Sequence, residues 1–438
     1  MFERNTKKEE RVVELTPQII ETLIILAAMI VLFVTEVIPL PVTAILAALA
    51  FAVLGIIPFT DAYYGFSTST IMLMIGAAIV GQSLFESGAA EMMGRGIVKL
   101  VGVNEQRMIA ALMLSCGVMS MFCSNIGTLS LFIPLGRSVA MVSGGKIKSR
   151  NLTFPLAIAV IAGGSITIFG STPQLIPDGL LRDAGYAGFG TFELGLVAAP
   201  TLLFATLFCS TFGYKWMDRH FSNVPALEAP SNTVEKELKT TPQTWLSIAG
   251  LLFMIVGLVA EWWTNGAVCL VAACFVISTK CISFKTAMQK APWSAIIVTG
   301  STLGVAKGMT ASGTDLFLAN IVFKIVGDQP SPWVITGVLG LLVMILGNFI
   351  SHSGTMSLLT PIFIPAAAMM GLDVHNTIYI LAVYIAICYA TPLATTTQGL
   401  TLTEGYKFSK HYTPGFGILM NACNGIIAWV ICSLKFMI

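Results

Sequence analysis

Charged residues are scarce in this sequence. Of its 438 residues only 11% are charged and 55% are hydrophobic, whereas a soluble domain carries about 25% charged residues. The mean hydropathy is +0.84. This composition excludes an ordinary soluble enzyme. The formal net charge of +2 also leaves no basic surface for a nucleic acid.

Motifs that bind metal or form disulfides are also lacking. The nine cysteines lie mostly inside apolar runs, with no CxxC pair and no His/Cys metal spacing. We therefore expect neither disulfides nor structural zinc. Residues 1–17 form a polar N-terminal segment, and the apolar run after them has no small-residue cleavage site, so we expect the first hydrophobic segment to stay in the membrane.

Long uncharged runs are abundant, and a helix of about 20 residues crosses a hydrocarbon core of about 30 Å. The sequence therefore predicts an all-α polytopic membrane protein. The expected apolar segments are 18–36, 40–57, 67–87, 107–142, 151–178, 194–214, 243–263, 266–280, 291–311, 332–370, 376–400 and 414–435.

Two of these segments, 107–142 and 332–370, are nearly twice the length of one crossing. Each is interrupted near its middle by small polar residues, at 124–128 and 351–355. We interpret each as a re-entrant helical hairpin. Because a broken helix at membrane depth is tolerated only where its free backbone groups face protein or water, these breaks predict a polar site inside the membrane.

The sequence also contains a repeat. Residues 124–134 overlay 351–361 at an offset of 227 residues, with six identities in eleven positions. The polar stretch 215–242 then reads as a linker between a first half, 18–214, and a second half, 243–438, each a five-helix unit with one hairpin. Five crossings per half make the second half inverted relative to the first.

The basic residues predict the orientation, because loops rich in Lys and Arg stay cytoplasmic. If ten segments cross, most basic residues fall on one side and the linker 215–242 is cytoplasmic, in a multi-pass protein of the cell membrane. The residues on that side are Arg95, Lys99, Arg107, Lys146, Lys148, Arg150, Lys215, Arg219, Lys236, Lys239, Lys280, Lys285, Lys290, Lys407 and Lys410.

Several motifs resemble those of the divalent anion/sodium symporter (DASS) family of the ion transporter superfamily. Residues 35–44 (TEVIPLPVTA) are similar to an early signature of that family. The tips at 124–126 and 351–353, and the helix breaks at 171–173 and 394–396, match its paired motifs. The resemblance implies an elevator-type homodimer that carries a small dianion through the lipid bilayer.

The resemblance also implies sodium as co-ion. Its first sodium site is matched by Ser120, Ser124, Asn125 and Ser171, all of which bear oxygen. The second site departs from the family pattern. Its matching positions are Gly347, Ile350, His352 and Ala394, where a family Thr has become Gly347 and an Asn has become His352, so the chain lacks two of the family's side-chain oxygens there.

The substrate positions implied by the resemblance lie on both tips and both breaks. They are Ser124, Asn125, Ile126, Ser351, His352, Ser353, Thr172, Thr395 and Thr396. His352 has three interpretations: a neutral ring packed in the hairpin, a hydrogen-bond donor to a substrate carboxylate, or a group that takes a proton in place of the second sodium.

These expectations favour a secondary active transporter, not an enzyme. The leading hypothesis is Na⁺-coupled symport of di- or tricarboxylates by an elevator motion. The alternative is a Na⁺-independent or H⁺-linked anion exchanger of the same fold. A channel would need a continuous polar pore, and an intramembrane hydrolase would need an acidic residue to orient the Ser351-His352 pair, which that segment lacks.

Overall fold

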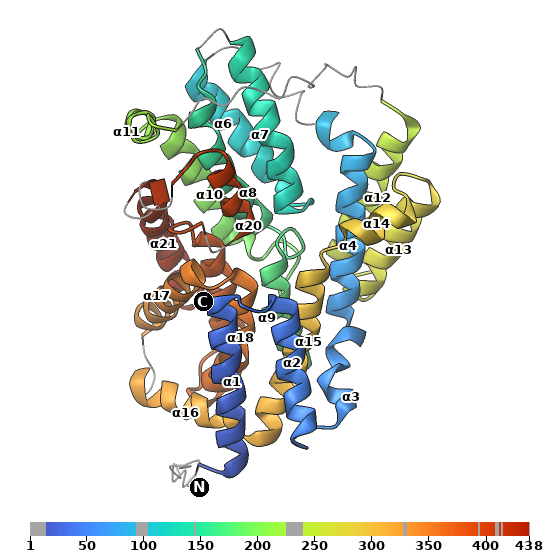
Figure 1. Ribbon diagram of the computed structural model, residues 1–438, viewed down its shortest axis with the longest axis vertical. Helices are drawn as coiled ribbons and strands as arrows, with labels where there is room; N and C mark the ends of the chain where they lie inside the picture. The colour runs from blue at the N-terminus through green and yellow to red at the C-terminus, as the bar shows by residue number, and fades with distance from the viewer. Residues whose placement is uncertain are drawn as a thin grey trace, which may run out of the picture.

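The computed structural model describes residues 15–92, 104–143, 146–224, 240–326, 331–392, 395–407, 411–412 and 415–437. These residues form helices and connecting turns, and none of them lies in a strand. Figure 1 shows the helices gathered into two groups along the long axis of the molecule. The all-α fold predicted from composition is therefore confirmed.

The first half begins with four helices and continues, after residues outside the described part, with the first hairpin and a broken helix. The elements are α1 (Pro17–Thr35), α2 (Leu40–Val53), α3 (Phe59–Ala62), η1 (Tyr64–Ser67), α4 (Ser69–Glu86), α6 (Glu105–Ser120), α7 (Asn125–Val142), η2 (Ser149–Asn151), α8 (Thr153–Gly164), η3 (Thr172–Gln174), α9 (Leu175–Asp183), α10 (Gly195–Ser210) and α11 (Tyr214–His220).

The second half runs through a similar order. Its elements are α12 (Pro242–Val259), α13 (Asn265–Ser278), α14 (Phe284–Lys290), α15 (Trp293–Ser312), α16 (Thr314–Val326), α17 (Pro332–Phe349), α18 (His352–Met369), α19 (Val374–Tyr384), η4 (Ile385–Ile387), α20 (Thr396–Thr403) and α21 (Phe416–Lys435). In each half two helices and a short helix precede a long helix, and a helix pair, a broken helix and a closing helix follow. The inversion of one half relative to the other stays a prediction.

The long helix of each half packs against the other half. Helix α4 lies along α13, and α15 lies along α2. Glycines allow this close approach, since a Cβ added at Gly76 of α4 would lie 2.4 Å from the backbone of Cys269, and one added at Gly308 of α15 would lie 2.4 Å from the ring of Phe51. The two halves are therefore interleaved in this region.

Both interruptions predicted within the long apolar segments are confirmed. Helix α6 ends at Ser120 and α7 begins at Asn125, while α17 ends at Phe349 and α18 begins at His352. The segments 151–178 and 376–400, which we expected as single apolar segments, are each divided by non-helical residues. The break after α8 covers 165–171, within the Gly-rich tract that predicted it.

Within the described ranges, five helices are long and apolar enough to cross a membrane, or six if α10 and α11, bent by 72° between them, form one span. The ten crossings expected from sequence include helices such as α2 and α13, which have 14 residues each, so length alone does not identify them as spans. The chain is a multi-pass membrane protein.

The start of the predicted linker is a packed helix, contrary to its interpretation as a connecting stretch. In α11, Met217 is buried, and Phe221 just after it is also buried. Lys148 donates from Nζ to Asp218 at 2.8 Å, which fixes α11 to the loop before α8. Polar composition concealed these contacts because the buried side chains are few. Residues 225–239 of the predicted linker lie outside the described residues.

Candidate functional site

The second helix of each hairpin begins with a serine cap. Ser124 Oγ accepts a hydrogen bond from the backbone N–H of Gly127 at 3.1 Å, and Ser351 Oγ accepts one from Gly354 at 3.1 Å. The two bonds occupy equivalent positions of the repeat. Helices α7 and α18 thus each direct a positive dipole end and free N–H groups at a hairpin tip, an arrangement that suits an anion.

Oxygen atoms gather behind the first tip. Ser120 Oγ lies 2.7 Å from Asn125 Oδ1 and 2.9 Å from the backbone carbonyl of Val160. A Cβ added at Gly164 would lie 2.3 Å from Asn125 Oδ1, so the absent side chain lets α8 approach the tip. Of the four residues predicted for the first sodium site, the structure brings Ser120 and Asn125 into direct contact.

Backbone carbonyls extend this group of oxygens. A Cβ added at Gly170 would lie 2.5 Å from the carbonyl oxygen of Gly164 and 2.8 Å from those of Ser120 and Met121. The carbonyls therefore converge on one face of the break after α8. Ser171, the next residue, is buried, whereas Ser124 is exposed at the tip. Neutral oxygens of this kind are the ligands that hard cations prefer.

The second predicted sodium site has a different environment. A Cβ added at Gly347 would lie 2.7 Å from Ile385 Cδ1 and 2.8 Å from Cys388 Sγ, so apolar groups and sulfur crowd that position. Ile350 is buried, and the ring of His352 forms a hydrogen bond with the backbone of Cys388. Ala394 lies outside the described residues. The described part of this site thus offers fewer oxygen atoms than the first.

His352 is 4% exposed, and its Nε2 has no hydrogen-bond partner among the residues that the structure describes. Its other ring nitrogen, Nδ1, therefore faces the Cys388 carbonyl and carries the hydrogen in the neutral ring. Nε2 is then an acceptor. In this neutral state the ring cannot donate to a substrate carboxylate from Nε2.

The two tips differ in exposure. Ile126 of the first tip is 47% exposed, whereas His352 at the equivalent turn of the second is buried. Ser351 and Ser353 are half-buried, as are Thr172 and Thr395, while Thr396 is exposed. Thr395 Oγ1 caps α20 by accepting from the backbone N–H of Gln398 at 3.2 Å. The first tip is thus the more open in this conformation.

Several functional candidates were not predicted from the sequence. Thr167 Oγ1 donates to the carbonyl of Met121 at 2.6 Å, and Thr391 Oγ1 donates to the carbonyl of Asn348. Asn348 Oδ1 also accepts from the backbone N–H of Ala390 at 2.8 Å. The two threonines are 224 residues apart, so a search for the repeat at that second offset is the signal that identifies them.

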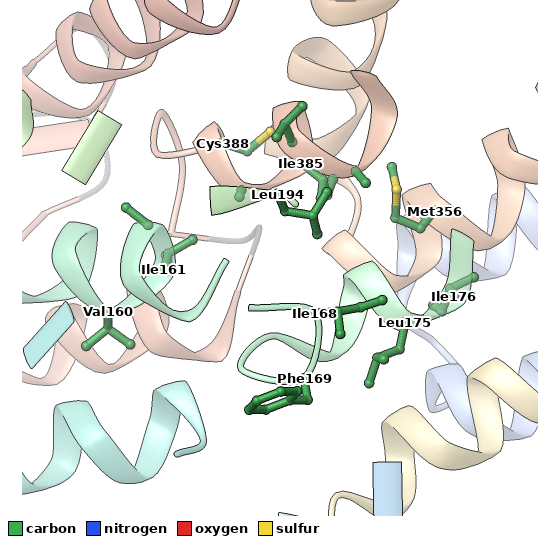
Figure 2. Close-up of a cluster of buried hydrophobic side chains, with 14 of the residues drawn as sticks. Val160, Ile161, Ile168, Phe169, Leu175, Ile176, Leu194, Met356, Ile385 and Cys388 are labelled. Carbon is green, nitrogen blue, oxygen red and sulfur yellow. The ribbon is translucent and has the colours of Figure 1, made fainter. Parts of the chain in front are cut away.

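Apolar side chains surround these polar groups. Figure 2 shows Met356 of α18 beside Ile176 of α9, with Leu175 and Ile168 nearby, and α18 packs on both η3 and α9. All four side chains are buried. The second helix of the second hairpin therefore packs on the broken helix of the first half, which strengthens electrostatic interactions at the tips by excluding water.

Known proteins with similar sequences are transporters. The sequence model of the citrate transporter family matches residues 30–386. This chain belongs to the citrate transporter family. A Staphylococcus saprophyticus protein named sodium-dependent dicarboxylate transporter SdcS is 21% identical over 425 residues, covering 88% of this chain and 80% of the relative. The resemblance to DASS transporters is thus confirmed.

Two further relatives of this family member are uncharacterized transporters. One, from Haemophilus influenzae, is 24% identical over 423 residues and covers 93% of this chain and 90% of its own length. The other, YfbS of Escherichia coli, is 31% identical over 191 residues, but the match covers 44% of this chain and only 31% of YfbS.

Solved transporter structures share the fold of this family member. The Alcanivorax borkumensis YdaH transporter matches with a TM-score of 0.59 at 15% identity, covering 86% of each chain. Neisseria gonorrhoeae MtrF matches with a TM-score of 0.59 at 12% identity, covering 97% of this chain and 96% of MtrF. At these identities the likeness establishes the fold.

Proposed function

We propose that this protein is a Na⁺-coupled symporter of small di- or tricarboxylates in the cell membrane. The observation that carries the proposal is the pair of serine-capped half-helices, α7 and α18, next to the oxygens of Ser120 and Asn125. Helix N-termini compensate an anion without a buried basic residue, and neutral oxygens bind its co-ion. The relatives named sodium-dependent dicarboxylate transporters support this choice.

Sodium binds, in this proposal, at Ser120, Ser124, Asn125 and the backbone of Ser171. The hydrogen of the Ser120 hydroxyl is shared with acceptors at Asn125 and Val160, so its lone pairs stay available to a cation. The anion contacts the tips at Asn125, Ile126, Ser351, His352 and Ser353, and the breaks at Thr172, Thr395 and Thr396.

The transport motion is an elevator in a homodimer, with the linker 225–239 on the cytoplasmic side. The group that contains both hairpins meets the other group mainly through α15, which packs on α18 and α9. Thr302 Oγ1 donates to Ser357 Oγ at 2.8 Å across this boundary. A boundary of few polar contacts suits sliding, and the open first tip and closed second tip suit one end of that motion.

A second candidate function is Na⁺-independent or H⁺-linked anion exchange. The observation that favours it is the second sodium position, where Gly347 lacks a side-chain oxygen and its surroundings are Ile385 and Cys388. In that case the return step requires substrate rather than sodium.

Labelled succinate and citrate uptake into proteoliposomes tests both candidates. An inward sodium gradient, an equal choline gradient, and preloaded internal substrate are compared. Sodium-driven accumulation above the external concentration supports the symporter. Uptake that needs internal substrate but not sodium supports the exchanger. Absence of uptake of either acid in all three conditions contradicts both.

A further inference from the structure

A buried amide beside the second hairpin tip has one occupied and one free end. Gln398 of α20 is 1% exposed, and its Nε2 donates to the backbone carbonyl of Cys388 at 3.2 Å. Because a carbonyl can only accept, this bond fixes the orientation of the amide. The free end is therefore the oxygen, Oε1, which has no hydrogen-bond partner within the described part of the chain.

The same carbonyl joins Gln398 to His352. Both side chains form hydrogen bonds with the backbone of Cys388, and two groups bonded to one atom lie within about 6 Å of each other. His352 Nε2 and Gln398 Oε1 are thus two free acceptors in one place.

The first half has a related group. Gln174, which is 224 residues before Gln398, is fully buried, and its Nε2 donates to the carbonyl of Ala382 at 3.5 Å. Its Oε1 likewise lacks a partner among the described residues. Both glutamines are therefore anchored by their NH₂ groups to the segment 382–388 and present oxygen, not N–H, as the free atom.

A free buried acceptor is costly, since a polar atom removed from water without a partner loses its hydration. A carboxylate cannot supply the missing partner, because both groups only accept. A sodium ion suits this position poorly, because one ligand is a ring nitrogen, hard cations prefer oxygen, and the Cys388 carbonyl already accepts two hydrogen bonds. A substrate hydroxyl supplies the missing donor.

We propose that Gln398, together with His352, makes this transporter select carboxylic acids that bear a hydroxyl group over the same acids without it. The inference rests on the proposed function, since it names the class of carboxylate that the site takes. A site that hydrogen-bonds a substrate hydroxyl discriminates against the analogue that lacks it, because its own polar groups are then left unpaired.

Two pairs of acids that differ only by a hydroxyl test this inference. Malate is compared with succinate, and citrate with tricarballylate, as competitors of labelled-substrate uptake by the full chain in proteoliposomes. We expect the hydroxylated member of each pair to compete at concentrations about tenfold lower or less. This comparison uses the unmodified protein and needs no variant to fold.

Gln398→Leu tests the residue itself. We expect the affinity ratio within each pair to fall to about one. Gln82→Leu is the matched control, because Gln82 bonds only the nearby Glu86 on α4, at 3.3 Å, and it should keep the wild-type ratio. Size-exclusion profiles of the purified variants show whether each is folded.

Four outcomes overturn the inference. Equal affinity for both members of each pair in the unmodified protein overturns it while the proposed function stands. A Gln398→Leu variant that weakens all four acids equally indicates a structural role. A variant that raises the sodium requirement without changing the ratios makes Gln398 a cation ligand instead. Failure of all four acids to compete or be transported overturns the proposed function, and this inference with it.

Discussion

The hydroxyl of Thr391 donates to the backbone carbonyl of Asn348 at the end of the helix that leads into the second hairpin tip. Thr167 makes the related bond to the Met121 carbonyl at the first tip, at 2.6 Å. In both halves a threonine from the break in the following helix satisfies a carbonyl that the hairpin break leaves free. The two tips are thus held to their helix breaks by the same kind of bond.

Replacing Thr167 with Val should destabilise the first tip by about 1 kcal/mol, because the Met121 carbonyl loses its donor. The Val side chain has a similar shape, so packing is kept. Thermal unfolding in detergent measures the change. Thr35→Val is the control, since the Thr35 hydroxyl bonds only the Val31 carbonyl of its own helix, and an equal loss of stability in both variants contradicts the assignment.

Removing the Ser120 hydroxyl should weaken sodium binding. In Ser120→Ala we expect the sodium concentration for half-maximal uptake to rise about tenfold, equivalent to about 1.4 kcal/mol of lost cation binding. Uptake titrated with sodium at fixed total salt gives this value. Ser115→Ala is the matched control, because Ser115 is also on α6 and its hydroxyl bonds only the Ala111 carbonyl. An unchanged sodium dependence in Ser120→Ala argues against the first sodium site.

Adding one methyl group at Gly170 should abolish transport. The Cβ would lie within 2.8 Å of three carbonyl oxygens, none of which can move independently of its backbone. At Gly399 the nearest atom would be 3.8 Å away, so Gly399→Ala is the matched control and should be tolerated. Initial uptake rates of both variants, corrected for protein incorporated, decide the point. Wild-type rates in Gly170→Ala would show that the carbonyls do not converge in the working protein.

The loop before α10 should stabilise the protein in a pH-dependent way. Glu193 accepts from His375 Nε2 at 2.8 Å and from Lys435 Nζ at 3.1 Å, and His375 Nδ1 lies 3.1 Å from the Ala187 carbonyl. Burial disfavours the charged carboxylate, but bonds from His375, the Gly190 N–H and Lys435 outweigh it and lower the pKa of Glu193 to about 2. The bond to Glu193 raises the pKa of His375 against the effect of burial.

The signs define a window. The contribution of His375 is complete below its ordinary pKa of about 6.5 and is lost as the pH rises through its higher folded value, while that of Glu193 is complete above about 4.5 and is lost as the pH falls toward 2. Thermal unfolding should therefore show a loss of about 1 kcal/mol above neutral pH, modest because both groups are partly exposed. His375→Gln should remove this slope and His220→Gln should keep it, whereas a slope that persists in His375→Gln assigns it elsewhere.

Linking α15 to α18 should stop the elevator. The hydroxyl oxygens of Thr302 and Ser357 are 2.8 Å apart, close enough for cysteines at these positions to form a disulfide. We expect the double variant T302C/S357C to lose uptake on oxidation and regain it with a thiol reductant. Each single variant, treated in the same way, controls for effects on the native cysteines. A fully oxidised double variant that still transports would mean that α15 and α18 do not separate during the cycle.

The sequence predicted the hairpin breaks because Ser124 and Ser351 interrupt long apolar runs, and an interruption is visible in any window of hydropathy. It did not single out Gln174 and Gln398, because one glutamine in a polar or broken stretch has no periodic signature. Their importance depends on which end of the amide is bonded, and only coordinates contain that information. The ion pair between Arg137 and Glu404 likewise joins segments too far apart for charge patterning to connect them.

The interleaving of the halves has a consequence for how the chain is made. Helix α2 ends at Val53, but its partner α15 begins only at Trp293. Until the ribosome has delivered the second half, α2 must wait in the bilayer with lipid or a chaperone against the surface that it later gives to α15. The first half alone is thus an assembly intermediate, and a gene split between the halves should yield a working protein only when both pieces are synthesised in the same cell.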